Sequence, residues 1–130
     1  MVKTFDKIIK VTQEDLDDLN HVNNVRYVQW IQDIAKEHWQ EKASKEIIEK
    51  SIWVVKSHFI EYKKAAVIND IITVKTYIKS SKGALSIRIV EMFDNKSNEL
   101  LLKSKTEWVL LDAITYKPIR ISEEIIAVFK

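Results

Sequence analysis

The chain has no cysteine, and its 130 residues include only one glycine and one proline. Without cysteine there is no disulfide, no thiolate nucleophile and no cysteine-ligated zinc site. The single glycine, Gly83, leaves no place for the glycine-rich loops that cradle nucleotide phosphates. P-loop proteins and dinucleotide-binding proteins are therefore excluded.

Long hydrophobic runs are also missing. No apolar stretch approaches the roughly 20 residues that a membrane-spanning helix needs. The N-terminal residues 1–6 read MVKTFD and lack the apolar core of a signal peptide. We therefore expect a cytoplasmic protein without a membrane partner.

No excess of one charge marks a binding partner. The 21 Lys and Arg residues are interleaved with 19 Asp and Glu residues, which leaves a formal net charge of +2. This pattern is typical of a mixed, solvated surface and not of a nucleic-acid-binding face. The three histidines, His21, His38 and His58, lack metal-ligand spacing, so neither a metal nor another cofactor is expected.

The apolar pattern predicts a strand, one long helix and then four further strands. Apolar positions recur at helical spacing from Asn24 to about Gln40, whereas the strand-like runs alternate. The expected strands cover residues 5–12, 53–62, 71–78, 85–93 and 100–111, with turns at 80–83 and 94–98, a short helical piece within 41–50 and a terminal helix capped by Ser122.

This order predicts one α+β domain over residues 1–130, in which a curved antiparallel sheet of about five strands wraps around one central long helix. Such a sheet covers one side of the helix and leaves strand edges open. Open edges are a liability that pairing with a second copy removes, so at least a dimer is expected.

The segment from Asp15 to Tyr27 carries the densest group of chemically useful side chains. It reads DLDDLNHVNNVRY and places carboxylates, a histidine and three asparagines between the first strand and the long helix. Polar residues of this kind at a helix start predict a site where a carboxylate, an imidazole and free backbone N–H groups converge.

The same segment resembles the D-x-D-x-x-G-H-V-N-N-x-x-Y signature of hotdog-fold thioesterases of the 4-hydroxybenzoyl-CoA thioesterase-like group. Within this group the chain resembles bacterial acyl-CoA thioesterases and half of an acyl-ACP thioesterase. Two further stretches support the resemblance: residues 60–70, IEYKKAAVIND, and residues 108–121, WVLLDAITYKPIRI. The resemblance covers nearly the whole chain in order. It implies the hotdog fold and hydrolysis of an acyl-CoA or acyl-ACP thioester.

Two departures from the pattern matter. Asn20 stands where the family has glycine, and asparagine is the residue other than glycine that best tolerates positive φ, so we expect the turn to survive. Leu19, Ala65 and Ala66 stand where plant-type acyl-ACP enzymes carry an asparagine and a Glu-Cys pair. A mechanism with a single aspartate is therefore the one that transfers.

In that mechanism the resemblance assigns Asp17 as general base on water or as nucleophile, and the residues leave both roles open. The oxyanion donor is expected to be a backbone N–H near Asn23 and Asn24 at the helix start. His21 either orients Asp17 or the substrate carbonyl, or makes a purely structural hydrogen bond. The expected substrate-binding residues are Asn23, Tyr27, Tyr62, Lys63 and Lys64.

Several of these residues also have structural interpretations. Asn23 suits the N-cap of the helix as well as substrate contact, and Asp15 is expected to stabilise the turn. Tyr27 suits the core as well as an acyl pocket. A non-catalytic protein that binds acyl thioesters, with Asp17 as a turn residue, is the alternative function.

The resemblance also implies a homo-oligomer, either a dimer or a tetramer. In the family the substrate lies across the subunit interface. Tyr62, Lys63 and Lys64 of one chain are accordingly expected to face Asp17 of the other. The implied partners are thus the acyl-CoA or acyl carrier protein thioester and a second copy of the chain.

Overall fold

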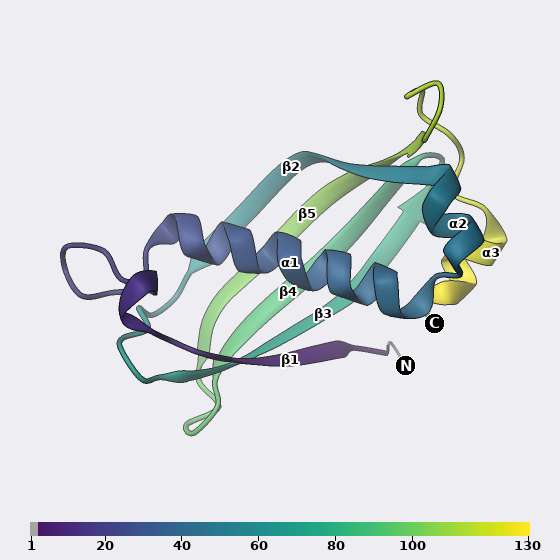
Figure 1. Cartoon of the computed structure of the whole chain (residues 1–130). Helices are drawn as coiled ribbons and strands as arrows, with labels where there is room; N and C mark the ends of the chain where they lie inside the picture. The colour runs from purple at the N-terminus through teal and green to yellow at the C-terminus, as the bar shows by residue number, and fades with distance from the viewer. Residues whose placement is uncertain (1–2) are drawn as a thin grey trace.

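The computed structural model describes residues 3–130. Its elements are β1 (Phe5–Lys10), the 3-10 turn η1 (Gln13–Asp15), α1 (Asn24–Lys42), α2 (Lys45–Lys50), β2 (Ser51–Tyr62), β3 (Ile71–Lys82), β4 (Leu85–Asp94), β5 (Leu100–Asp112) and α3 (Glu123–Val128). The five strands form one antiparallel sheet in the order β1-β3-β4-β5-β2. α1 lies across one face of this curved sheet (Figure 1). The predicted α+β hotdog architecture is confirmed.

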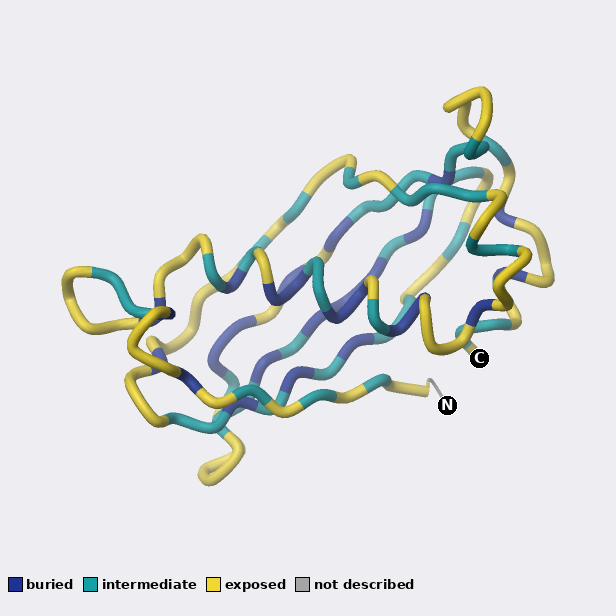
Figure 2. The backbone as a smooth tube through the Cα atoms, viewed as in Figure 1, coloured by how far each residue is buried: buried dark blue, intermediate teal, exposed yellow. Residues whose placement is uncertain are grey.

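The core lies between α1 and the middle strands. The helix buries one face, and Ile31 and Ile34 on it are fully inaccessible to solvent. They pack in one cluster with Val74 of β3, Val90 of β4 and Leu102 of β5. Figure 2 shows buried positions along α1 and along the middle strands that it crosses. Complete burial of an isoleucine stabilises the fold by about 1.5–3 kcal/mol. The helical period read from the sequence therefore identified the face that holds the helix on the sheet.

In β4, the face that contains a serine and an arginine points toward the core. Its sequence sets Leu85, Ile87, Ile89 and Phe93 on one face, and Ser86, Arg88 and Met92 on the other. The structure buries the second face under α1, where Arg88 is 4% exposed. On the first face Leu85, Ile87 and Phe93 are half-buried, and Ile89 is buried. A polar serine and a charged arginine thus lie on the inner face of a central strand.

The turn predicted at residues 80–83 is confirmed at Gly83 and wrong for the three residues before it. β3 continues to Lys82, and Ser80 pairs with Ile87 after a register shift between Ile78 and Ser80. The turn begins at Gly83, whose φ is +61°. A glycine adopts this left-handed conformation without steric cost, so the chain reverses there while the two serines remain in the strand.

The other boundaries follow the sequence closely. α1 begins at Asn24 as predicted and ends two residues later than expected, at Lys42. The Ser122 Oγ accepts a hydrogen bond from the Ile125 N–H at 3.2 Å, which confirms the predicted cap of α3. No helix within residues 3–130 combines the length and apolarity needed to cross a membrane.

Candidate active site

The loop from Asp17 to His21 projects beyond the N-terminal end of α1 (Figure 1). An isolated antiparallel bridge between Leu16 and Val22 closes its base. The Val22 N–H also donates to the Ala66 carbonyl at 2.9 Å, which ties the loop to the segment after β2. The loop is therefore anchored on both sides and holds its residues in one place at the helix start.

Asp15 anchors this arrangement from beneath. Its carboxylate accepts from the Thr12 N–H at 2.8 Å and lies 3.0 Å from Nε of Arg26. Its carbonyl accepts from the Asn23 N–H at 2.8 Å. The side chain is almost completely buried. These contacts support the structural role that the sequence favoured for Asp15.

Asp17 uses only one of its two carboxylate oxygens within the protein. Oδ1 accepts from the Leu19 N–H at 2.9 Å and from the His21 N–H at 3.1 Å. Its backbone N–H donates to the His21 carbonyl at 2.7 Å. Oδ2 has no hydrogen-bond partner within residues 3–130. The loop therefore fixes the carboxylate and leaves one oxygen for a water molecule or a substrate.

The bend of this loop depends on Asn20, which has φ of +62°. Left-handed backbone is disfavoured for most side chains but is tolerated by asparagine. The expectation that Asn20 replaces a glycine at a positive-φ position is confirmed. The departure from the family signature therefore leaves the turn around Asp17 intact.

The first turn of α1 leaves one amide free. Asn23 is the N-cap, and its Oδ1 accepts from the Val25 N–H at 2.9 Å. The Asn23 carbonyl accepts from the N–H groups of Arg26 and Tyr27. In the described part of the chain, the Asn24 N–H has no acceptor. This amide lies at the positive end of the helix dipole, where it can donate to a developing negative charge.

His21 is connected to Asp17 through the backbone alone. Its side chain is exposed and makes no hydrogen bond to residues 3–130. Asp18 beside it is exposed as well. The structure thus places the imidazole at the loop surface, next to the candidate carboxylate in sequence and without a fixed orientation toward it.

Tyr27 and Tyr62 form an aromatic wall between the first turn of α1 and the end of β2. Their ring centroids are 5.8 Å apart. The Tyr27 hydroxyl accepts from the buried Ala66 N–H at 3.1 Å. Burial raises the pKa of Tyr27, so its hydroxyl stays protonated. Tyr27 therefore has a structural hydrogen bond, and Tyr62 is the more exposed member of the pair.

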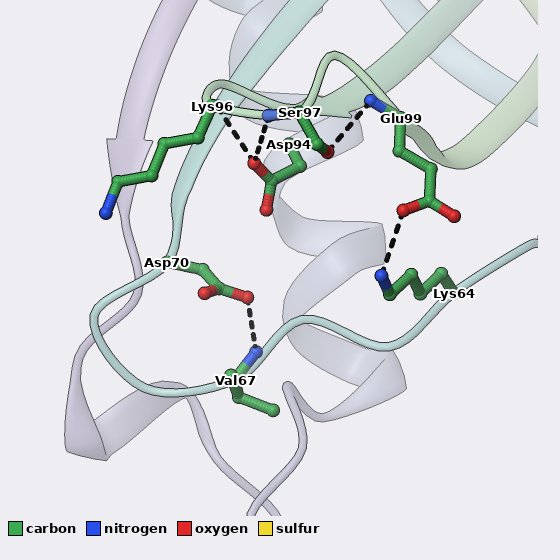
Figure 3. A network of polar contacts seen from close by, with 7 residues as sticks. All are labelled: Lys64, Val67, Asp70, Asp94, Lys96, Ser97 and Glu99. Atoms are coloured by element: carbon green, nitrogen blue, oxygen red, sulfur yellow. Dashed lines mark hydrogen bonds and ion pairs between the residues drawn. The ribbon is translucent and has the colours of Figure 1, made fainter.

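Both predicted lysines are held by carboxylates on the surface. The Lys63 Nζ lies 3.3 Å from Glu61, and the Lys64 Nζ lies 2.9 Å from Glu99. Figure 3 shows the Lys64–Glu99 pair beside the turn in which Asp94 Oδ1 accepts from the N–H groups of Lys96 and Ser97. The exposed pairs are weakly held, so both ammonium groups can exchange partners.

The structure also contains a cavity of about 450 Å³ that sequence reasoning missed. It lies between the C-terminal half of α1 and strands β2, β4 and β5. Its lining includes Gln32, Trp39, Trp53, Arg88, Trp108 and Phe129. The signal that could have found it is Arg88, an isolated charge within the alternating run of residues 85–90.

Arg88, on the wall of this cavity, forms a buried polar pair with His38. The Arg88 Nη1 donates to the His38 Nδ1 at 2.9 Å and to the Thr76 Oγ1 at 3.0 Å. Burial lowers the pKa of Arg88 to about 9, so the guanidinium remains charged at neutral pH. Burial, and next the charges of Arg88 and Lys42, lower the pKa of His38 to about 4. The imidazole is therefore neutral and acts as the acceptor.

Within one chain the buried Arg88–His38 pair and the Asp17 loop lie at opposite ends of α1, while the cavity extends along the helix from Gln29 to Gln40. At 1.5 Å per residue, the fourteen positions between Asn24 and His38 correspond to about 20 Å. The structure therefore brings Asp17, Asn23, Asn24, Tyr27 and Tyr62 to one end of the helix, and Arg88 and His38 to the other. No group of three or more His, Cys, Asp or Glu side chains among residues 3–130 is arranged to hold a metal ion.

The loop before α1 anchors a carboxylate, and the first turn of α1 leaves an amide without an acceptor in the described part of the chain. These are the two kinds of group that thioester hydrolysis requires. The sequence model of the acyl-ACP thioesterase N-terminal domain matches residues 2–129, and the chain belongs to this family of thioester hydrolases. Comparison with curated protein sequences gives no match.

Solved structures of thioesterases share the fold. The probable thioesterase YbaW from Escherichia coli is similar with a TM-score of 0.85 and 22% identity, over 95% of this chain and 94% of that one. The 1,4-dihydroxy-2-naphthoyl-CoA thioesterase Slr0204 from Synechocystis gives 0.84 and 16%, over 98% and 96%. The 12:0-ACP thioesterase from Umbellularia californica gives 0.83 and 16%, over 98% of this chain and 51% of that one.

Proposed function

We propose that the chain hydrolyses acyl-CoA or acyl-ACP thioesters at the junction of the Asp17 loop and α1. The observation that carries this proposal is that one loop–helix junction holds two unused groups: within residues 3–130, Oδ2 of Asp17 has no hydrogen-bond partner and the Asn24 N–H has no acceptor. The family match supports thioester chemistry. The named substrates of two similar structures, a CoA thioester and an ACP thioester, suggest both carriers.

The chemistry requires an attacking oxygen and a donor for the oxyanion. As general base, Asp17 takes a proton from water while the water oxygen bonds to the carbonyl carbon; the tetrahedral intermediate then collapses, the C–S bond breaks, and the leaving thiolate takes up the proton from Asp17. As nucleophile, Asp17 attacks that carbon itself, the thiolate leaves, and water then hydrolyses the mixed anhydride. In both routes the Asn24 N–H stabilises the tetrahedral oxyanion. Such a donor contributes about 3 kcal/mol in measured cases.

We further propose that the active form is a homodimer at least. The sheet ends at β2, and this edge strand carries exposed apolar side chains, with Val54 38% and Phe59 64% exposed. An unprotected edge of this kind favours pairing with another strand. If two β2 strands pair about a twofold axis, the two α1 helices run antiparallel on the same face. The Asp17 loop of one chain then lies beside the cavity of its partner.

Tyr62 was expected to face Asp17 of the other chain, and its position in the structure changes that expectation. Tyr62 already contacts Tyr27 of its own chain, so it can serve the site at its own helix start.

Light scattering tests the dimer, because a mass near 15 kDa at micromolar concentration would contradict it. Lys63 and Lys64 remain proposed contacts of the carrier, since their ammonium groups are exposed and face solvent.

The activity test compares wild type with Asp17→Asn on acyl-CoA and acyl-ACP substrates of several chain lengths. General-base assistance contributes about 10²–10⁴-fold, so Asp17→Asn should lower kcat by at least about a hundredfold. Asp18→Asn is the matched control, because this neighbouring carboxylate is exposed and has no hydrogen bond to the loop amides. It should leave kcat near the wild-type value.

Equal melting temperatures of the two variants are needed to separate chemistry from folding. Near-normal turnover in Asp17→Asn on every substrate of the wild type would show that the assignment is wrong. If the wild type binds acyl thioesters and hydrolyses none, the chain is instead a non-catalytic acyl-binding protein.

A further inference from the structure

Arg88 is a buried cation without an anionic partner. It is 4% exposed, and none of the ion pairs formed within residues 3–130 includes it. Its contacts are the neutral His38 ring, the Thr76 hydroxyl and the face of Phe129, whose centroid is 5.2 Å away. A buried charge with only neutral partners is unfavourable for folding, because hydrogen bonds and an aromatic face offset only part of its lost hydration.

The guanidinium also keeps one edge free. The hydrogen bonds to His38 and Thr76 both come from Nη1. Nε and Nη2 have no acceptor among residues 3–130, and neither atom is among the fully buried side-chain atoms that lack a partner. They are therefore accessible from the cavity that Arg88 lines. The Nε–Nη2 edge presents two parallel N–H groups, which match the two oxygens of a carboxylate.

The cavity around Arg88 suits an apolar chain that ends in one negative charge. Three tryptophans, Trp39, Trp53 and Trp108, form its apolar walls. Asp33 and Lys36 on the exposed side of α1 also line it and offset each other in charge, so Arg88 supplies the net positive charge. A single guanidinium balances a carboxylate, whereas a phosphate dianion would require a second cation.

We infer that this cavity receives the acyl group of the substrate, and that Arg88 binds a carboxylate at the distal end of that group. The preferred substrates are then monothioesters of dicarboxylic acids. The inference rests on the proposed function for the thioester itself and on the proposed dimer, which sets the cavity beside the Asp17 loop of the partner chain. The carboxylate site depends only on Arg88 and the cavity.

Substrate preference gives the first test. Sebacoyl-CoA and decanoyl-CoA have the same chain length and differ in the distal carboxylate. Wild type should show a kcat/KM for sebacoyl-CoA at least about tenfold higher, because the site is built to pair with that group. Arg88→Met should abolish the preference, mainly through a higher KM for sebacoyl-CoA, with decanoyl-CoA unaffected or improved. Arg120→Met is the matched control, since Arg120 is exposed and outside this cavity.

Binding without turnover gives the second test. Octanoate and its uncharged amide, octanamide, are titrated calorimetrically into wild type and Arg88→Met. Wild type should bind octanoate at least about tenfold more tightly than octanamide, and Arg88→Met should bind both equally. If Arg88→Met does not fold, Arg88→Lys takes its place; it keeps the charge, loses the planar pair of donors and should lose most of the discrimination.

The outcomes separate the two proposals. Hydrolysis of both thioesters at equal kcat/KM, with equal binding of octanoate and octanamide, overturns the carboxylate site and leaves the proposed function standing. Loss of carboxylate discrimination in Arg88→Met, in a protein that hydrolyses no thioester, supports the site and overturns the proposed function. A change of oligomeric mass in Arg88→Met, with no change of preference or binding, means that Arg88 pairs with a second copy, and this also overturns the inference.

Discussion

His38 allows a prediction about stability that does not depend on the function. The ring is 3% exposed, stacks on Phe5 at 4.9 Å and accepts a hydrogen bond from Arg88. Burial, followed by the charges of Arg88 and Lys42, lowers its pKa from 6.5 to about 4. A proton on His38 would thus be placed in an apolar site beside a cation.

The sign of the effect follows from proton binding. Between pH 4 and 6.5 the unfolded chain carries a proton on His38 that the folded chain does not. The free energy of unfolding therefore rises with pH in this window. The contribution of the neutral ring is fully present above pH 6.5 and is lost as the pH falls toward 4. The difference between the ordinary pKa of 6.5 and the pKa of about 4 corresponds to about 3 kcal/mol.

The assay is urea denaturation of wild type and His38→Gln at a series of pH values from 7 to 4. Glutamine keeps a hydrogen-bond acceptor for Arg88 and does not titrate, so the difference between the proteins isolates His38. Wild type should lose about 3 kcal/mol more than the variant across this range. The other histidines and the carboxylates contribute equally to both proteins. Equal losses, or an NMR titration of the His38 ring near pH 6.5, would refute the reasoning.

Three further changes test local features. Tyr27→Phe removes the acceptor of the buried Ala66 N–H and should lower the free energy of unfolding by about 1–3 kcal/mol in chemical denaturation. Asn20→Gly should leave the melting temperature unchanged or raised, whereas Asn20→Val should lower stability by about 1–2 kcal/mol, because φ is +62° there. Ser122→Ala removes the cap of α3 and should lower stability by about 1 kcal/mol, again by denaturation.

The sequence predicted the elements well where one physical signal dominates. The helical period of α1 and the alternation of the strands each mark a buried face, and burial is what forms these elements. The start of the turn after β3 was mispredicted because, after a register shift at Ser80, polar residues continue to pair as part of the strand. The two serines are common in turns, yet they stay paired in the strand because Gly83 adopts the left-handed conformation that the chain reversal requires.

In the candidate sites, too, some residues could be placed from the sequence and others could not. The conformations of Asn20 and Asn23 could be predicted because each depends on local backbone geometry: Asn20 has a positive φ, and Asn23 caps the N-terminus of α1. Arg88 could not be placed, because alternation in β4 shows that two faces exist and not which one lies under α1. The apolar face of that strand would have been the ordinary choice for the core. The cavity contains a charge because the face of β4 that carries Ser86 and Arg88 points toward α1.

The contacts of Asp17 explain why an asparagine at this position separates folding from chemistry. The loop uses only Oδ1, as the acceptor of two backbone N–H groups, and an asparagine amide oxygen can accept the same two bonds. The atom that changes is the one at the place of Oδ2, which has no partner within residues 3–130. An amide nitrogen there can neither take a proton from water nor attack a carbonyl carbon. Alanine would remove the loop contacts as well, so a loss of turnover in Asp17→Ala would mix the two effects, whereas Asp17→Asn tests the reactive oxygen alone.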